Sequence, residues 1–428
     1  MGRVSWEKAG WAVLVFAVLT RMVLAHFIPL ADDGGNASYV NTARDIFSGH
    51  YAGYSTLHRL PMTSWIFAGG LRLFGGDVHM LPLLQRALGL ATIAMAMGTA
   101  GLAWGRRAAV LAGLLLVMQG QFAFQESFLL SEPSARFFLA LAVLCAVGLG
   151  KSRPGAGALF AGFGLGLVSG LAALTRGELI VLGPIIAAYL ALAGKPGFPR
   201  GLPILCLAGW ALVIGAWVIR NERVFGYRGL TPDSVTTMTT TALPLIDYDS
   251  GVELEAKRFL REQVAAAGST NGLDPRPTTI ERLQKERGYT YLRAETALGR
   301  IVREAVFARP LGYLWRAFPN ILKYLWPMRW AEDRNGGRMR LPPEADNPAL
   351  WSLLKLDQLW GFVVLAAALA APGRIRRRVA GRLEAGFVCA IFVALWVVIG
   401  LVDVPVPRIQ AQLFLPLALL GGFASADG

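Results

Sequence analysis

The sequence predicts an all-α polytopic membrane protein with about ten transmembrane helices and with amphipathic helices in loops that face outward. Of its 428 residues, 54% are hydrophobic and 16% are charged, and the mean hydropathy is +0.48. Charged residues make up about a quarter of an ordinary soluble domain, so this composition argues against one. Apolar runs long enough to cross roughly 30 Å of hydrocarbon recur along the chain. The charges between these runs also alternate in sign, as expected for loops on the two sides of a bilayer.

The first apolar run, Ala9–Leu30, follows Arg3 and Lys8. Residues 23–25 (Val-Leu-Ala) resemble a signal-peptidase site, but the run is long for a signal peptide and further runs follow it. We therefore expect an uncleaved first helix. Arg21 lies late in this run, where a central arginine costs on the order of 2.5–3.5 kcal/mol. Its side chain must reach the membrane interface or a polar cavity.

Nine further runs complete the expected bundle. They are Leu81–Trp104, Ala108–Phe124, Phe128–Gly150, Ala158–Leu174, Leu179–Ala193, Gly201–Ile219, Trp351–Ala371, Ala385–Leu401 and Ile409–Phe423. Two long polar segments interrupt them, residues 31–80 and residues 220–350. Because no internal repeat or soluble domain stands out, we interpret residues 1–428 as one transmembrane domain.

The charged loops orient these spans, because lysine and arginine mark the cytoplasmic side. Basic loops hold Arg106, Arg107, Lys151, Arg153, Lys195, Arg200, Arg374, Arg376, Arg377 and Arg378, and acidic loops hold Asp32, Asp33, Glu126, Glu132 and Asp403. Both termini are then cytoplasmic, and both long polar segments lie outside. The net charge of +14 is explained by this topology and by attraction to anionic lipid, rather than by nucleic acid. Cys145, Cys206 and Cys389 lie in apolar runs, so no disulfide is expected.

The second polar segment has helical character. Glu253–Ala267 and Thr278–Ala308 show helical periodicity, and Glu295 is expected on the polar side of the second of these stretches. Leu311–Trp330 is rich in tyrosine and tryptophan. This composition suits a helix that lies in the lipid headgroup layer.

Six polar motifs follow one another at the outward ends of the runs. They are Asp33–Tyr39 with Ala43-Arg44-Asp45-Ile46, His58-Arg59-Leu60-Pro61, Leu130-Ser131-Glu132, Leu174-Thr175-Arg176-Gly177-Glu178, Arg220-Asn221 to Phe225-Gly226, and Pro407-Arg408. In this order they resemble the GT-C superfamily of integral membrane glycosyltransferases. The resemblance is to the branch of protein O-mannosyltransferases and lipid A aminoarabinose transferases. The sequence departs from the family pattern where Gly34, Gly35 and Asn36 follow the acidic pair and where Ser38 replaces a tyrosine.

The resemblance implies transfer of a sugar from a polyprenyl phosphate such as undecaprenyl phosphate, with inversion at the anomeric carbon. The acceptor would be an envelope glycolipid, glycan or protein at the periplasmic face of a bacterial cytoplasmic membrane. The implied roles are a general base at Asp33 or Asp32 assisted by Glu132, donor-phosphate contacts by Arg59, Arg176, Arg220 and Arg408, and substrate contacts by Tyr39, His58 and Glu178. No cofactor is required by the motifs, although Asp33 and Glu132 could converge on a divalent metal ion.

The residue types fit this chemistry independently of the resemblance. Arginines on the outer side run against the topology rule and so call for an anionic partner, and a positioned carboxylate base is worth about 10²–10⁴-fold in rate. Asp33 lies beside glycines and before an expected helix from Ser38 to Phe47, whose N-terminus favours the ionised form. A solvated Asp-Asp-Gly turn is the simpler alternative. A flippase of lipid-linked sugars is the alternative function, but the charges gather at helix ends rather than at the bilayer midplane.

Overall fold

The computed structural model describes residues 6–27, 37–50, 55–152, 155, 157–193, 199–266, 275–325, 348–373, 381–402 and 407–425. Within these ranges every regular element is a helix. The long bundle consists of α1 (Trp6–Phe27), α5 (Leu81–Trp104), α6 (Arg106–Val117), α8 (Glu132–Lys151), α9 (Ala158–Ala173), α10 (Leu182–Ala193), α11 (Leu202–Phe225), α18 (Pro348–Leu369), α20 (Arg382–Val402) and α21 (Pro407–Ser425). The expected all-α class is therefore confirmed for the described chain.

Several bundle helices are apolar enough to cross a bilayer. In the described residues four have the necessary length and composition: Val78–Trp104, Glu132–Lys151, Leu202–Phe225 and Arg382–Val402. Shorter apolar helices span Ala158–Ala173, Gly177–Ala193, Gln358–Gly373 and Gln412–Ser425. Together they describe a multi-pass membrane protein.

Two of the expected runs are divided in the structure. The run from Ala108 to Phe124 is split where α6 ends at Val117 and the short helix α7 (Gly120–Gln125) begins. The polar Gln119 adopts an extended backbone (φ −79°, ψ 91°) at that break. The run from Leu179 to Ala193 starts as the 3₁₀ turn η2 (Gly177–Val181) before α10.

Close backbone packing joins α9 to α11. A Cβ atom on Gly166 would lie 2.0 Å from the carbonyl oxygen of Cys206, and one on Gly209 would lie 2.3 Å from that of Phe163. Only glycine fits at such distances. Small residues on facing helices allow this approach in membrane bundles, where van der Waals contact rather than the hydrophobic effect drives association.

Arg21 lies inside the bundle, 3% exposed, and donates to Oε1 of Glu126 at 2.7 Å. The sequence required this side chain to reach either the membrane interface or a polar cavity, and in the structure it reaches a polar partner inside the bundle. The pair joins α1 to the segment between α7 and α8.

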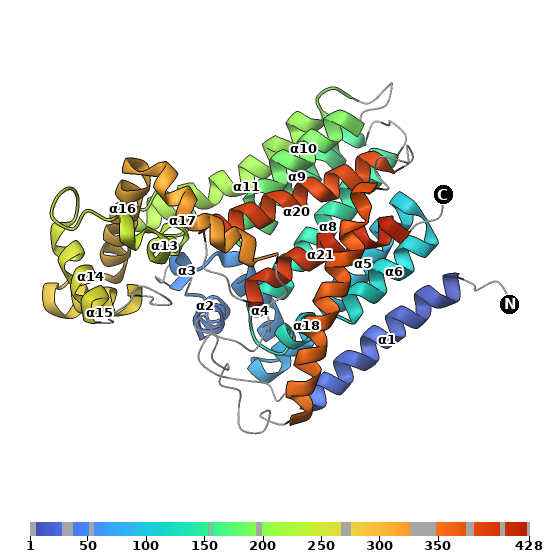
Figure 1. Cartoon of the computed structure of the whole chain (residues 1–428), viewed down its shortest axis with the longest axis horizontal. Coiled ribbons are helices and arrows are strands. Elements are labelled where there is room, and N and C mark those ends of the chain that lie inside the picture. Colours follow the sequence, from blue (N-terminus) through green and yellow to red (C-terminus); the bar gives the residue numbers. More distant parts are fainter. Residues whose placement is uncertain are drawn as a thin grey trace.

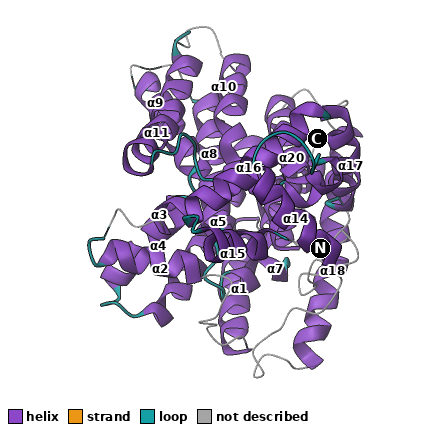
Figure 2. Cartoon of the chain, turned by 90° about the vertical axis from the view of Figure 1, so that its left-hand side faces the viewer, coloured by secondary structure: helices purple, strands orange, loops and turns teal. Residues whose placement is uncertain are grey.

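The loop helices gather at the end of the bundle away from both termini (Figure 1). From the first polar segment these are α2 (Ala37–Phe47), α3 (Ser55–His58), α4 (Pro61–Leu73) and the turn η1 (Val78–Met80). From the second they are α12 (Asp233–Thr236), α13 (Thr239–Ala242), η3 (Leu243–Leu245), α14 (Leu254–Ala266), α15 (Arg276–Arg287), α16 (Tyr291–Ala308) and α17 (Pro310–Lys323). Figure 2 looks onto this end and shows α14, α15 and α16 in front of the long helices.

The expected helix over Thr278–Ala308 is two helices. It breaks at Gly288, whose φ of 63° ends α15 in the left-handed conformation that favours glycine. Residues of α14, α15 and α16, with Leu243 and Tyr313, bury a hydrophobic core of their own. Glu295 was expected on the polar side of this stretch, but it is 2% exposed. That expectation is wrong, because Glu295 packs against His58, whose Nδ1 lies 3.5 Å from its Oε1, while Arg293, Arg300 and Arg303 of the same helix stay exposed.

Candidate active site

Two turns that lie far apart in the sequence meet at the loop-helix end of the bundle. The first joins α3 to α4 and contains His58 and Arg59, and the second joins α9 to η2 and contains Arg176. The backbone N–H of Met62 donates to the carbonyl oxygen of Leu174 at 3.1 Å. This hydrogen bond fixes the two turns against each other, so Arg59 and Arg176 lie at the same end of the bundle.

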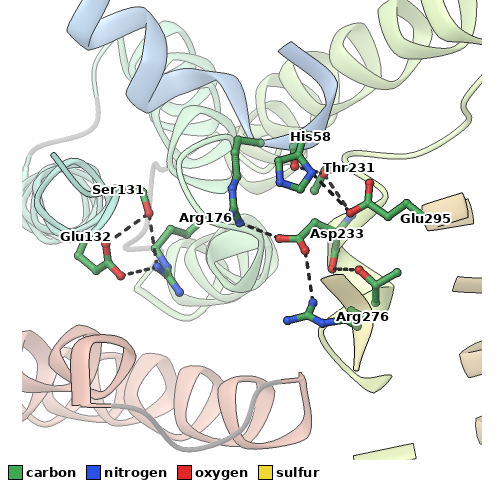
Figure 3. A network of polar contacts seen from close by, with 10 residues as sticks. His58, Ser131, Glu132, Arg176, Thr231, Asp233, Arg276 and Glu295 are labelled. Carbon is green, nitrogen blue, oxygen red and sulfur yellow. Dashed lines mark hydrogen bonds and ion pairs between the residues drawn. The ribbon is translucent and has the colours of Figure 1, made fainter. Parts of the chain in front are cut away.

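Arg176 is held by two carboxylates. Its Nη1 donates to Oε1 of Glu132 at 2.9 Å and to Oγ of Ser131 at 3.4 Å, and its Nε donates to Glu178. The side chain of Glu132 is 2% exposed and that of Arg176 is 15% exposed. Burial alone lowers the pKa of Arg176, but the carboxylates of Glu178 and Glu132 outweigh it, so the pKa is raised above its usual value. Arg176 is therefore a fixed cation (Figure 3).

A second group of polar residues surrounds Arg59. Its Nη1 donates to Oδ2 of Asp233 at 2.8 Å, and Arg276 donates to Oδ1 of the same carboxylate at 3.4 Å. Burial lowers the pKa of Arg59, but the charge of Asp233 overrides this effect and the pKa is raised. Asp233 therefore bridges the first polar segment to α15.

His58 connects the same turn to α16. Its Nδ1 lies 3.5 Å from Oε1 of Glu295, and its carbonyl oxygen accepts a hydrogen bond from Thr231 Oγ1 at 2.8 Å (Figure 3). The ring of Tyr291 packs edge-on against His58 at 5.4 Å. Burial and the nearby Glu295 carboxylate raise the pKa of Tyr291 to about 12, so this phenol stays neutral at physiological pH.

Tyr39 lies beside Arg59. The centroid of its ring lies 5.8 Å from the guanidinium carbon of Arg59, a distance at which a cation–π contact is favourable. The carbonyl oxygen of Tyr39 accepts from Ser64 Oγ at 3.2 Å, which ties α2 to α4.

Arg220 lies near the end of α11, beside aromatic rings. Its guanidinium carbon is 4.7 Å from the ring centroid of Trp217 and 4.9 Å from that of Phe225. The neighbouring Asn221 donates to the carbonyl oxygens of Gly229 and Leu230 at 2.9 and 3.0 Å. This amide holds the connection that leads to Asp233, so α11 supports the site through the backbone.

Six of the site residues expected from the sequence thus lie around these two turns: Tyr39, His58, Arg59, Glu132, Arg176 and Glu178. Asp32 and Asp33 lie outside the described residues, as does the side chain of Arg408, whose backbone is the second residue of α21. Among the residues that the structure does describe, no cluster of three or more histidine, cysteine or acidic side chains is arranged to hold a metal ion. Because Asp33 lies outside the described residues, the expected metal pair of Asp33 and Glu132 stays a prediction.

Sequence reasoning missed Asp233, Arg276 and Glu295. All three lie in the second polar segment, where no motif marked them. Asp233 contacts Arg59, Glu295 contacts His58, and Arg276 contacts Asp233. The one available signal was the placement of charged residues on amphipathic helices, and that signal put Glu295 on the wrong side.

The sequence of residues 58–219 matches the profile of a family described as dolichyl-phosphate-mannose-protein mannosyltransferase. The matched stretch begins at His58, contains Arg59, Glu132, Arg176 and Glu178, and ends just before Arg220. No curated protein matches the sequence.

The fold is similar to that of the archaeal oligosaccharyltransferase AglB from Archaeoglobus fulgidus in complex with an inhibitory peptide and a dolichol-phosphate. The TM-score is 0.54 at 16% identity, over 99% of this chain and 50% of AglB. The same enzyme tethered to an acceptor peptide with the NVT sequon gives a TM-score of 0.53 at 15% identity, over 99% and 49% of the two chains. This chain therefore spans about half the length of AglB.

ArnT from Cupriavidus metallidurans bound to undecaprenyl phosphate has 16% identity over 99% of this chain and 78% of its own, but its TM-score is only 0.41. The likeness in fold is therefore to AglB, and the family match comes from the sequence of residues 58–219. Residues 58–219 match the dolichyl-phosphate-mannose-protein mannosyltransferase family, and the fold of the chain is similar to that of AglB.

Proposed function

We propose that the protein transfers a sugar from a polyprenyl-phosphate donor to an envelope acceptor at the outer face of a bacterial cytoplasmic membrane. The observation that carries this proposal is the meeting of Arg59 and Arg176 beside Tyr39 at one end of an apolar bundle. Both guanidiniums are largely buried and held charged by carboxylates. Such fixed cations suit a lipid phosphate that must leave with negative charge.

The proposed step is a direct displacement. The acceptor hydroxyl oxygen forms a bond to the anomeric carbon while the bond from that carbon to the phosphate oxygen breaks, which inverts the configuration. The hydroxyl proton passes to a carboxylate, and the electron pair leaves on the polyprenyl phosphate. Arg59 and Arg176 stabilise that leaving group, and Arg220 and Arg408 are further candidates for phosphate contact.

Asp33 is the proposed base, with Asp32 as the alternative. Both precede α2, the helix that places Tyr39 beside Arg59. Glu132 assists by orienting Arg176, since its carboxylate bonds that guanidinium at 2.9 Å. Glu178 holds the same side chain from the other direction, and Tyr39 and His58 contact the substrate.

The proposed topology has about ten spans, with residues 31–80 and 220–350 outside and both termini in the cytoplasm. Two observations support it. The described loop helices lie at the end opposite the N and C termini (Figure 1), and arginines and lysines dominate the loops on the terminal side.

The test compares Asp33→Asn with Asp32→Asn in the purified full-length protein. Mass analysis of envelope glycolipids and glycoproteins from a deletion strain first identifies the product. Release of undecaprenyl phosphate from the matching lipid-linked donor is then measured in nanodiscs, and binding of undecaprenyl phosphate itself is measured separately. Asp33→Asn is expected to lose at least 10²-fold in transfer rate with unchanged binding, whereas Asp32→Asn keeps substantial activity.

The reverse pattern assigns the base to Asp32. If both variants turn over at the wild-type rate, the transferase proposal fails. Movement of intact lipid-linked sugar between leaflets, without release of undecaprenyl phosphate, supports the flippase instead.

A further inference from the structure

A groove lies between α10 and α20, away from the arginine site. Its volume is about 590 Å³, and its walls include Ala188 and Leu192 of α10 with Arg382, Gly386, Phe387 and Ala390 of α20. Ligand pockets typically occupy about 300–1,000 Å³, so this space is large enough for a lipid chain.

Small residues keep the groove open. Arg382, Gly386 and Ala390 are spaced four apart and therefore lie on one face of α20. A Cβ atom on Gly386 would meet no atom within 4 Å. The stacked rings of Tyr189 and Phe387, 4.3 Å apart, close the groove on the inner side. Leu192 at its rim is 73% exposed, so the groove opens sideways onto the apolar surface of the bundle.

Polar groups gather at the Arg382 end of this groove. Arg382 is exposed, and in the described part of the chain it makes no ion pair. Lys151 lies nearby, 3.1 Å from Oε1 of Glu384, two residues along α20. The hydroxyl of Tyr189 is buried against Gly150 and has no hydrogen-bond partner among the described residues. An apolar channel with positive charge at one end complements a lipid that has an anionic headgroup.

The position of this groove separates it from the proposed donor site. Leu192, at the rim of the groove, lies sixteen positions after Arg176 in the sequence. Sixteen residues correspond to about 24 Å along a helix axis. That distance is close to the roughly 30 Å thickness of the hydrocarbon core. The sequence before α20 is also basic, with Arg374, Arg376, Arg377 and Arg378, as expected of a loop at the cytoplasmic leaflet.

We propose that this groove binds one anionic phospholipid of the cytoplasmic leaflet. An acyl chain lies along Gly386 and Ala390, and the phosphate is held by Arg382. The site is distinct from the donor site in place and in leaflet, and it does not depend on the glycosyltransferase assignment.

Native mass spectrometry of the delipidated full-length protein, titrated with phosphatidylglycerol or phosphatidylcholine, tests the proposal. The wild type is expected to retain one phosphatidylglycerol selectively. Arg382→Gln should weaken that binding about fivefold, the contribution of one basic residue near an anionic lipid. Gly386→Leu should remove the bound lipid whatever its headgroup, because the new side chain projects into the groove and its Cβ meets no atom within 4 Å. If Gly386→Leu fails to fold, Ala390→Leu, one helical turn further along α20, should block the groove and remove the lipid in the same way.

Two matched controls separate the groove from general lipid contact. Gly215→Leu adds the same side chain to α11, where a Cβ also meets no atom within 4 Å, and Arg200→Gln removes another exposed arginine. Both should bind phosphatidylglycerol as the wild type does. The proposal is overturned if phosphatidylcholine binds equally well, if the leucine variants of the groove keep the lipid, or if Arg200→Gln weakens binding as much as Arg382→Gln. Displacement of phosphatidylglycerol by substoichiometric undecaprenyl phosphate also overturns it, since the groove would then be a polyprenyl site.

Discussion

Arg176 and Arg220 are both proposed to contact the donor phosphate, but their surroundings differ. Arg176 forms ion pairs with the buried Glu132 and the partly buried Glu178. Arg220 stacks on Trp217 and Phe225 and bonds the amide oxygen of Asn221. Removing one partner of a buried ion pair typically costs about 3–5 kcal/mol, because the other charge is left unpaired. A contact with an aromatic face contributes about 0.5–2 kcal/mol.

We therefore expect Arg176→Met and Arg220→Met to differ in stability while both weaken the binding of undecaprenyl phosphate. Arg176→Met should lower Tm by several degrees more than Arg220→Met, as followed by thermal unfolding in detergent. Arg176→Lys is the matched control, because it keeps the charge but loses the forked geometry, and it should recover most of the stability and little of the binding. Unchanged affinity for undecaprenyl phosphate in both methionine variants removes these arginines from the phosphate site.

Single residues also show what the sequence could not supply. Motif order selected Arg59, Glu132, Arg176 and Glu178, of which Glu132, Arg176 and Glu178 stand near the ends of apolar runs and Arg59 lies in the first polar segment. The partners of Arg59 come from the second polar segment, and only the folded chain places Asp233 and Arg276 around it. Long-range ion pairs leave no periodic signal, so these residues were not foreseen.

Among the elements, the end of α11 sets the path of the chain toward the site. Gly226 caps this helix with φ 66° and ψ 17°, and Asn221 then fixes residues 229 and 230. From there Thr231 reaches His58 and Asp233 reaches Arg59. A residue other than glycine in the left-handed region costs roughly 1–2 kcal/mol.

Gly226→Ala should therefore destabilise the protein by about 1–2 kcal/mol and also raise the KM for the lipid donor. Gly288→Ala is a control of matched geometry, since Gly288 caps α15 with φ 63° and ψ 22°. It should cost similar stability with a smaller change in KM. Equal effects on KM would mean that the turn after α11 has no special part in placing Asp233.

α17 carries an exposed apolar stripe that includes Leu311, Trp315, Phe318 and Leu322. Their spacing of four, three and four residues places them on one face of the helix. Helix formation over Pro310–Lys323 agrees with the expectation for this aromatic stretch, while its residues from Trp326 onward lie outside the described chain. An interfacial position in the headgroup layer is a prediction that can be measured.

Spin labels at Trp315→Cys and Arg316→Cys test this position in a background without the three native cysteines. The spin label at position 315 should be relaxed by oxygen, which partitions into acyl chains. The label at the adjacent position 316 should be relaxed by a water-soluble nickel chelate. If both labels respond mainly to nickel, α17 stands in water and the interfacial assignment is wrong.

The whole molecule consists of an apolar bundle with the loop helices gathered at one end. Composition and the alternation of charge were sufficient to predict this division. The boundaries were less accurate where polar residues interrupt an apolar run, as at Gln119, or where one glycine ends a helix, as at Gly288. Hydropathy averages over such positions, so it cannot locate them. Because the loop helices lie at the end of the bundle away from both termini, we expect the loop helices and the termini on opposite sides of the membrane.

Single cysteines at Ser250 and Arg200, in the same cysteine-free background, check that prediction. Both residues are exposed in the structure. An impermeant thiol reagent applied to intact cells with a permeabilised outer envelope should label position 250, whereas position 200 should react only after lysis. Labelling in the opposite order reverses the topology and places the proposed site in the cytoplasm.

The pairing of Arg21 with Glu126 also has a consequence for biosynthesis. The two residues are 105 positions apart in the chain, and translation adds about 5–20 residues per second. The first helix thus leaves the ribosome with an unmatched charge some 5–20 seconds before its counter-ion is made. During that interval an arginine near the bilayer centre weakens insertion by about 2.5–3.5 kcal/mol. Stable integration of the N-terminal helix therefore waits for a segment made much later, and its assembly is coupled to the progress of synthesis.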